Sequence, residues 1–288
     1  MTSTDLFESA IAKARWEIVP VRDPEKAIAA LPERSTVTVG CFAKTADGYL
    51  QTLSIVERLS GADFHAVPHI PARSFDSKNH ALEIAKRYVD SGVTEVFVVG
   101  GNADEPHGPF NGAIDLLRCL ADSNVSFSSV GVAAYPEGHP SPAFDYYGGL
   151  REKSEFASYC VTQVCFDGSA IKDEARRLRE QDIELPMHVG VPGVLAQTEL
   201  LKLSRWMGIG NSMKFLLKQR KLATRLLRPT EYNPHELIED LLPAVHEPAS
   251  GIIGLHLNTF NQVARTREWV RGMLGTDEPL GAGNHGNS

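Results

Sequence analysis

The sequence lacks the marks of a membrane-anchored or disulfide-bonded protein. None of its apolar runs reaches the 18 residues that a membrane-spanning helix needs, and residues 1–15 contain no apolar signal core. These absences favour a cytoplasmic protein. The cysteines are scattered without a CxxC pair, so we expect buried free thiols rather than disulfides or zinc ligands. They are Cys41, Cys119, Cys160 and Cys165.

Basic residues are also outnumbered by acidic ones. The chain carries 29 Lys and Arg against 36 Asp and Glu, which gives a formal net charge of −7. This balance argues against a general nucleic-acid binder or a protein of the membrane surface, because both kinds of partner are anionic. A GxGxxG turn is also missing after the first expected strand, so an open dinucleotide-binding sheet is a poor interpretation.

What the sequence does contain is a regular alternation of strands and helices. Short apolar runs predict eight strands, at residues 15–20, 36–41, 64–70, 94–100, 127–134, 158–164, 186–191 and 252–258. Amphipathic stretches predict helices at 24–31, 46–60, 78–91, 111–122, 146–157, 169–180, 195–207 and 260–274. Eight such units in strict alternation favour an α/β fold of the (β/α)8 TIM-barrel type over a doubly wound sheet.

One connection is longer than the others. About sixty residues separate the seventh and eighth strands, and within them 209–226 and 234–245 have the pattern of extra helices. We expect a single barrel domain over residues 1–275, followed by a disordered tail at 276–288.

An aromatic ring, a carboxylate and an imidazole follow the fifth strand directly. The apolar run 130–134 ends in YPEGHP at 135–140, whose two prolines stop any regular element. Tyr135, Glu137 and His139 therefore lie at a strand's carboxyl end, the edge of a β/α sheet where ligands bind. We expect a binding site here.

A carboxylate also lies inside the first strand. Glu17 stands between Trp16 and Ile18, and a buried carboxyl group needs either a partner or a raised pKa. A salt bridge to Arg15 or Lys13 is the structural alternative. A carboxyl group with a raised pKa can instead donate a proton at neutral pH, and we favour this general-acid interpretation.

Three further strand ends carry residues suited to a ligand. Gly100 and Gly101 let the backbone approach a flat or phosphorylated ligand closely, although a tight turn explains them equally well. Gln163 follows an apolar strand, where an amide needs a polar partner such as a substrate. His65 and His69 form an HxxxH, but residues four apart on a strand lie about 13 Å apart, so they cannot share a metal ion.

Together, these motifs resemble the methylenetetrahydrofolate reductase family over residues 15–270. The resemblance is carried by WEIVP at 16–20, PHIPAR at 68–73, VVGGN at 98–102, AAYPEGHP at 133–140, LREK at 150–153, VTQVCFD at 161–167 and LHLNTFNQ at 255–262. AAYPEGHP and the TQxxFD pattern are specific, and the other segments support them. The resemblance implies an eight-stranded barrel, in agreement with the strand count.

The same resemblance implies a reaction and its cofactors. 5,10-Methylenetetrahydrofolate would be interconverted with 5-methyltetrahydrofolate, with FAD as cofactor and NADH or NADPH as hydride donor, in one-carbon metabolism and methionine biosynthesis. Glu17 matches the family's acid, and Gln163 matches a residue that contacts folate and nicotinamide. Flavin-contacting positions are implied for His69, Gly101, Asn102, Tyr135, His139 and Lys153, with Asn102 also near the folate. The expected partners are small molecules, with no metal, nucleic acid or membrane, and a homo-oligomer is left open.

Two positions depart from the family pattern. Asn102 stands where an aspartate is usual, and Gly100 replaces an arginine of the flavin-binding turn. Because a neutral side chain beside the flavin favours its reduced anion, we expect a raised flavin potential. Three alternatives stay open: hydride transfer from NAD(P)H to folate without flavin, a non-catalytic folate- or flavin-binding barrel, and a zinc hydrolase using His69, His139, His188 and His256.

Overall fold

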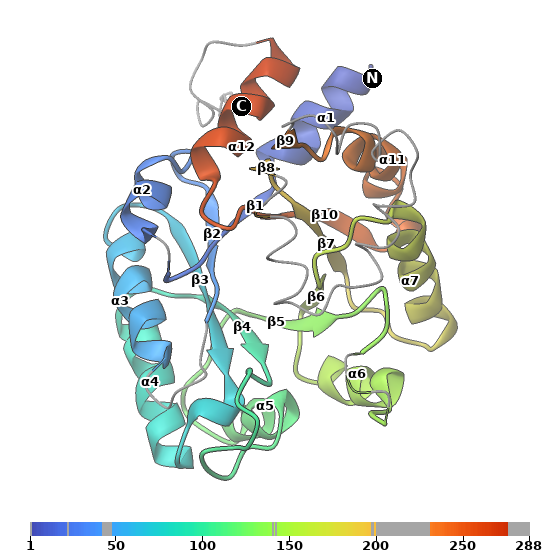
Figure 1. Cartoon of the computed structure of the whole chain (residues 1–288). Helices are drawn as coiled ribbons and strands as arrows, with labels where there is room; N and C mark the ends of the chain where they lie inside the picture. The colour runs from blue at the N-terminus through green and yellow to red at the C-terminus, as the bar shows by residue number, and fades with distance from the viewer. Residues whose placement is uncertain are drawn as a thin grey trace, which may run out of the picture.

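Eight parallel strands close into a barrel in the computed structural model, which describes residues 2–21, 23–41, 48–139, 141, 143–196, 199 and 231–275 (Figure 1). The strands are β1 (Arg15–Ile18), β2 (Thr36–Val39), β3 (His65–Pro71), β4 (Glu95–Val99), β5 (Ser129–Ala134), β6 (Tyr159–Thr162), β7 (Met187–Pro192) and β10 (Ile252–Asn258). Around the barrel their order is β1, β10, β7, β6, β5, β4, β3, β2, and every neighbouring pair is parallel. The predicted (β/α)8 fold is confirmed, as are all eight strands.

Helices surround the outside of the barrel in Figure 1. They are α2 (Pro24–Ala29), α3 (Gly48–Ser60), α4 (Lys78–Asp90), α5 (Ala113–Ala121), α6 (Tyr146–Ser154), α7 (Gly168–Glu180), α11 (His235–Val245) and α12 (Val263–Leu274), with short 3-10 turns η1 (Ala72–Ser74) and η2 (Pro248–Ser250). Each α-helix in this set coincides with a predicted one, including α11 in the long connection. Within the described ranges, no helix combines the length and apolarity needed to cross a bilayer.

Helix α1 (Ser3–Ala12) is absent from the prediction, although a local signal for it exists. Thr2 and Asp5 form a capping box, in which each side chain accepts the backbone N–H of the other residue. The helix buries Phe7 and Ile11 and packs against α11 and α12. It therefore belongs to the barrel's outer layer rather than to a free terminus.

The predicted helix at 195–207 is wrong at its start. Leu195–Ala196 form strand β8, which pairs antiparallel with β9 (Glu231–Tyr232) in a small ribbon. Pairing between segments this far apart leaves no local pattern, so sequence periodicity cannot reveal it. The rest of that helix apart from Glu199, the predicted helix at 209–226 and the predicted tail at 276–288 lie outside the described residues.

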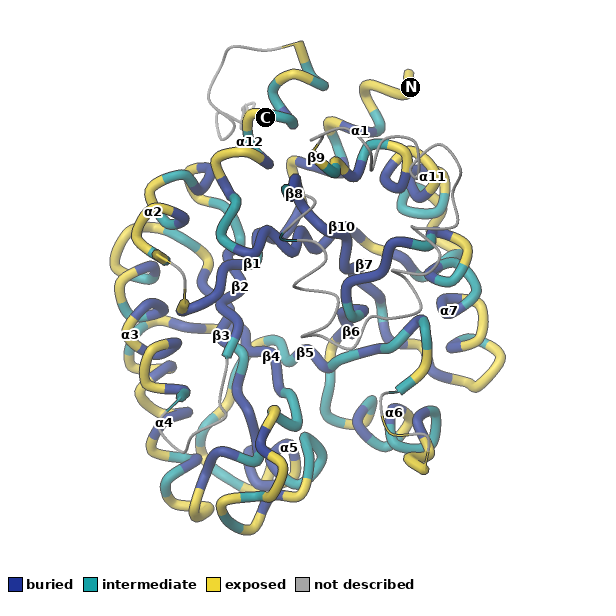
Figure 2. The backbone as a smooth tube through the Cα atoms, in the orientation of Figure 1, coloured by how far each residue is buried: buried dark blue, intermediate teal, exposed yellow. Residues whose placement is uncertain are grey.

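Most residues of the barrel strands are buried, as the largely dark blue tube of Figure 2 shows. Their outer faces pack under the helices, where Ile18, Val37 and Val39 are fully buried. An inner apolar cluster consists of Val67, Phe97, Tyr159 and Val161. None of the four cysteines forms a disulfide; Cys119, Cys160 and Cys165 are buried as expected, whereas Cys41 is only partly buried.

An ion-pair network fills the amino-terminal end of the barrel interior. Arg15 Nη1 donates to Glu95 Oε1 at 2.5 Å and to the Tyr159 hydroxyl at 3.0 Å, and His65 Nε2 lies 2.9 Å from Glu95 Oε2. Gly131 makes room for this network, because a side chain there would collide with the Tyr159 ring. Arg15 is engaged here, so the salt bridge considered between Arg15 and the carboxylate of the same strand is wrong.

Candidate functional site

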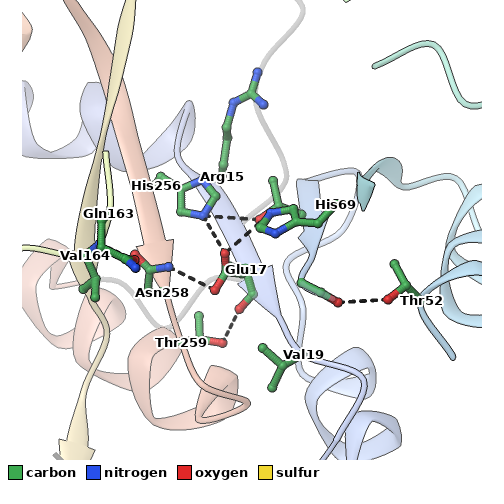
Figure 3. A network of polar contacts seen from close by, with 12 residues as sticks. Arg15, Glu17, Val19, Thr52, His69, Gln163, Val164, His256, Asn258 and Thr259 are labelled. Carbon is green, nitrogen blue, oxygen red and sulfur yellow. Dashed lines mark hydrogen bonds and ion pairs between the residues drawn. The ribbon is translucent and has the colours of Figure 1, made fainter. Parts of the chain in front are cut away.

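The carboxylate of Glu17 is the centre of a polar cluster at the carboxyl ends of the strands (Figure 3). His256 Nε2 lies 3.1 Å from Oε2, and Asn258 Nδ2 donates to Oε1 at 3.0 Å. Thr259 donates its hydroxyl to the backbone carbonyl of Glu17 at 2.6 Å. Because β1 pairs with β10 in a register that sets Glu17 opposite Asn258, the closing seam of the barrel brings these groups together.

The pKa of Glu17 is lowered, which corrects the raised value expected from sequence. Burial by itself raises the pKa of this carboxyl group. Hydrogen bonds from His256 and Asn258, together with the electrostatic influence of the nearby His256 and His69 imidazoles, outweigh the effect of burial. Glu17 is therefore a carboxylate at neutral pH in the unliganded protein, and a role as acid requires that it gain a proton during the reaction.

His69, on β3, approaches the same carboxylate without bonding to it. Its Nε2 lies 3.7 Å from Glu17 Oε2 and, among the described residues, has no hydrogen-bond partner although the atom is buried. The ring packs against Phe97 at a centroid distance of 4.7 Å. Burial lowers the pKa of His69 to about 4 in spite of the nearby carboxylate, so the ring is neutral and the hydrogen-bonding capacity of its Nε2 is unused by the described residues.

Gln163 lies at the end of β6, and its surroundings reach the Glu17 cluster. The side-chain Oε1 of Gln163 accepts from the Val164 backbone N–H at 3.0 Å. On the intervening strand β7, a side chain at Gly190 would meet both Val164 N and Asn258 Oδ1, each at 3.2 Å. Asn258 Oδ1 is buried and has no hydrogen-bond partner within the described ranges. The structure thus brings Gln163 and Asn258 to the same part of the barrel mouth.

The loop after β5 gathers three of the expected cofactor residues in one aromatic cluster. Tyr135 and His139 pack edge to face at 4.9 Å, and the His139 ring lies 4.5 Å from that of Phe144. Lys153 Nζ lies 6.0 Å from the Phe144 ring centroid. Lys153 is buried, at 9% exposure, and burial lowers its pKa. With no ion pair to another described residue, its ammonium group suits an anionic ligand.

A buried tyrosine–glutamate pair outside the barrel holds the start of this loop. Tyr146 accepts the Tyr135 backbone N–H at 2.9 Å and donates its hydroxyl to Glu174 Oε1 at 2.6 Å. Tyr147 donates to Glu174 Oε2 at 3.0 Å. Glu174 is 1% exposed, and burial raises its pKa. Sequence reasoning misses this support because its members come from the separate helices α6 and α7.

Gly101 and Asn102 lie in the loop that follows β4. Gly101 has φ +95°, a conformation that favours glycine, and a side chain there would touch Pro71 Cβ at 3.2 Å. The Arg73 backbone N–H donates to the Gly100 carbonyl at 2.9 Å, which ties this loop to the end of β3. Gly101 therefore serves the turn, whereas Asn102 is exposed and the Gly100 Cα faces open space.

The four histidines considered for a zinc site do not converge. Across the residues that the structure describes, no group of three or more His, Cys, Asp or Glu side chains is arranged to hold a metal ion. His69 and His256 approach Glu17, whereas His139 packs in the loop after β5. The zinc-hydrolase alternative has no support in this geometry.

Sequence reasoning does not identify His256 and Asn258 as the partners of Glu17. They lie 239 and 241 residues further along the chain. A spacing of two puts both side chains on the same face of a strand, which is the one available signal. Only the pairing of β10 with β1 turns that face towards the carboxylate.

Sequence comparison connects the chain to one family. The family model described as methylenetetrahydrofolate reductase matches residues 23–271. Methylenetetrahydrofolate reductase 2 of Schizosaccharomyces pombe is 27% identical over an alignment of 161 residues that covers 49% of this chain and 24% of that protein. Methylenetetrahydrofolate reductase 1 of the same yeast is 24% identical over an alignment of 191 residues that covers 61% and 30% of the two chains. The chain thus spans less than a third of the length of either relative.

Solved structures share the fold at low sequence identity. A protein from Clostridium thermocellum, described as binding two copies of 5-methyl-5,6,7,8-tetrahydrofolic acid, has a TM-score of 0.56 at 14% identity and covers 92% of this chain and 99% of its own. The spore cortex-lytic enzyme SleL of Bacillus cereus has a TM-score of 0.50 at 9% identity, over 93% and 76% of the two chains. These likenesses establish the barrel alone. The family model, by contrast, spans most of the sequence, and on that ground the chain belongs to the methylenetetrahydrofolate reductase family.

Proposed function

We propose that this protein reduces 5,10-methylenetetrahydrofolate to 5-methyltetrahydrofolate, with hydride from NADH or NADPH carried by FAD. The observation that carries the proposal is the Glu17 cluster, in which His256 and Asn258 bond a carboxylate at the barrel mouth. Beside it lies His69 Nε2, which has no hydrogen-bond partner among the described residues. Family membership supports this reaction. Likeness to a barrel described as binding 5-methyltetrahydrofolic acid supports a folate as substrate.

The reaction needs an acid at the mouth of the barrel. The bridging methylene group accepts hydride poorly until its bond to N10 opens, and that nitrogen leaves only when it is protonated. Formation of each molecule of 5-methyltetrahydrofolate therefore adds one hydride to the bridging carbon and one proton to N10. Glu17 would deliver the proton, and Gln163, near Asn258, would orient the folate.

The described residues fit a flat, anionic cofactor. Lys153 is a buried ammonium group that forms no ion pair with another described residue, which suits a phosphate. Tyr135 and His139 offer aromatic rings, and His69 Nε2 offers a buried atom that makes no hydrogen bond to the described residues. FAD held by these residues would supply the ring that accepts hydride from the nicotinamide and transfers it to the folate.

A flavin-independent reductase is the second candidate, and the loop after β4 favours it. Gly100 has no side chain where the family pattern has an arginine, and its Cα faces open space. Asn102 is neutral and exposed. With fewer charged groups to hold FAD, the nicotinamide would give hydride to the folate directly. The role of Glu17 is the same in both candidates, because N10 needs its proton in either case.

The visible spectrum of the purified protein separates these candidates. A flavin absorption band that bleaches on anaerobic addition of NADH or NADPH, with 5-methyltetrahydrofolate formed from the methylene compound, would support the first. Product formed without any band, even after FAD is added, would support the second. A protein that binds folate or flavin and forms no product would contradict both and favour a non-catalytic barrel.

Glu17→Gln tests the role of the carboxylate itself. We expect formation of 5-methyltetrahydrofolate to fall by about 100-fold or more, the usual contribution of a general acid, while electron transfer from NADH to a quinone persists. Glu25→Gln is a matched control, because Glu25 is paired with Arg58 at the surface of α2. If Glu17→Gln lowers both activities equally, the role of Glu17 is structural.

A further inference from the structure

Glu17 and His256 form a buried pair, and the proposed reaction does not explain where Glu17 obtains the proton that it donates. The lowered pKa of Glu17 makes it a carboxylate before substrate binds, yet the reaction requires its protonated form once in every turnover. His256 is 3% exposed, and its Nε2 lies 3.1 Å from Glu17 Oε2. An imidazole at this distance can hold a proton and pass it to the carboxylate directly.

We propose that His256 stores the proton that Glu17 donates, so that the two side chains act as a single acid. This inference rests on the proposed function. Before binding, the proton lies on Nε2 of a doubly protonated His256 ring and is hydrogen-bonded to the Glu17 carboxylate. During the reaction it crosses to Oε2 and then to N10, and the bond between N10 and the bridging carbon breaks. Solvent returns one proton to the pair when the product leaves.

The transfer within the pair moves no net charge into the protein. A carboxylate beside an imidazolium and a carboxylic acid beside a neutral imidazole both have zero net charge, so the two forms differ little in desolvation. Flat rings that cover the mouth would remove water from Glu17, and further burial raises the pKa of a carboxyl group. Ligand binding therefore shifts the proton from His256 to Glu17 at the stage when the acid is needed.

His69 does not compete for this role, although it approaches the same oxygen. Its Nε2 is 3.7 Å from Glu17 Oε2 and makes no hydrogen bond to it. Burial lowers the pKa of His69 to about 4, so the ring stays neutral. His256 acts through Glu17 and does not touch the substrate, so it is a positioning residue rather than a catalytic one.

His256 Nδ1 is buried without a hydrogen-bond partner within the described ranges, and so is His188 Nδ1. The two residues lie on neighbouring strands, with His188 opposite Gly254. Buried polar atoms of this kind are usually bridged by an internal water. Burial lowers the pKa of His188 to about 3, so this ring is neutral and does not compete with His256 for the proton.

The other charged and titratable groups of the barrel interior leave this assignment intact. They are Arg15, His65, His69, Glu95 and His188. Arg15 is paired with His256 in the register of β1 and β10, but its charge is neutralised by Glu95 at 2.5 Å. The carboxylate of Glu17 is therefore the group that balances a charge on His256.

Proton sharing is measured in the unliganded full-length protein by NMR with 15N-labelled histidine. We expect the His256 ring of the wild type to carry protons on both nitrogens at pH 7, and Glu17→Gln to leave it with one. A ring with a single proton in both proteins would overturn the proposal. This measurement needs no folate, so it tests proton sharing between His256 and Glu17 independently of the reaction. If the wild type forms no 5-methyltetrahydrofolate, only the proposed function is refuted.

A comparison of substitutions at His256 gives the second test. Glutamine can still donate a hydrogen bond to Glu17 but cannot carry a proton, so His256→Gln and His256→Ala should both lower kcat for folate reduction by about 100-fold. Both substitutions should also change the pH dependence of kcat. If His256→Gln retains the wild-type rate and pH profile while His256→Ala does not, the role of His256 is only to hold Glu17. His235→Gln, on the outer helix α11, is the control.

Discussion

Glu17 Oε1 and Asn258 Nδ2 lie 3.0 Å apart across the seam where the first and last strands of the barrel meet. The same backbone register that closes the fold therefore positions the carboxylate. Gly190 leaves the room that Asn258 occupies, since a side chain at that position would press on Asn258 Oδ1. A functional group held by strands in this way is more rigid than one held by a loop.

Removal of the hydrogen bond between Asn258 and Glu17 should change the pKa of Glu17. Asn258→Ala removes a hydrogen bond that stabilises the charged carboxylate by about 1.5–3 kcal/mol, so the pKa of Glu17 should rise. Titration of the labelled Glu17 carboxyl carbon by NMR measures the change. Asn124→Ala, at an exposed position, is the control. An unaltered titration would show that the bond contributes nothing to the charge state.

Gln163 should matter for both the folate and the nicotinamide half-reaction. Gln163→Ala is expected to weaken the folate half-reaction by about 1–3 kcal/mol, the cost of an unpaired polar group on the ligand. The resemblance implies a nicotinamide contact for Gln163 as well, so reduction of the cofactor by nicotinamide in the absence of folate should also weaken. Stopped-flow measurement of the two half-reactions separates these effects, with the exposed Gln51→Ala as control. If Gln163→Ala leaves both half-reactions unchanged, Gln163 has no substrate role.

Asn102 should influence the redox potential of the cofactor. Asn102→Asp adds a negative charge to the loop after β4, and a negative charge destabilises an anionic reduced flavin. We expect a lower potential in the variant than in the wild type, by spectroscopic titration against a reference dye. Asn124→Asp makes the same charge change at another exposed position and should leave the potential where it is. A potential insensitive to Asn102→Asp would exclude this residue from the flavin environment.

The Arg15–Glu95 pair should make stability depend on pH. Burial raises the pKa of Glu95, but His65 and Arg15 lower it to about 2 in total. A lowered pKa contributes stability above the unfolded value near 4.5, and this contribution, about 3 kcal/mol, is lost as pH falls towards 2.

Arg15→Met tests this contribution, because it leaves a buried carboxylate without its cation and should cost about 3–5 kcal/mol at pH 7. Urea unfolding at pH 7 and pH 3 should show a smaller difference between variant and wild type at the lower pH. A difference that is the same at both values would contradict the assignment.

Tyr146 should stabilise the loop that carries the cofactor residues. Tyr146→Phe leaves the Tyr135 N–H and one oxygen of Glu174 without partners, at a cost of about 1–3 kcal/mol in unfolding free energy. Binding of FAD, measured by titration, should weaken as the loop loosens. Glu174→Gln keeps an acceptor for Tyr146 and serves as the comparison. Equal FAD affinity in wild type and Tyr146→Phe would mean that the loop does not bind the cofactor.

Much of the architecture can be read from local patterns. Each barrel strand is a short apolar run, and every α-helix covering it except α1 has a recognisable amphipathic period. Helix α1 was also open to prediction, because the three-residue spacing of Thr2 and Asp5 is a capping-box signal. The β8–β9 ribbon was not, because Leu195 pairs with Tyr232 across a long stretch of chain.

By itself, the sequence determined the barrel, the family and the presence of Glu17, Tyr135 and Gln163 at strand ends, since these follow from local periodicity and motifs. The tertiary structure alone decided that Glu17 bonds His256 and Asn258, that Arg15 is engaged elsewhere, and that the pKa of Glu17 is lowered rather than raised. The physical reason is that a buried carboxyl group responds to the partners around it. Here those partners come from the other end of the chain and are delivered only when the last strand closes on the first.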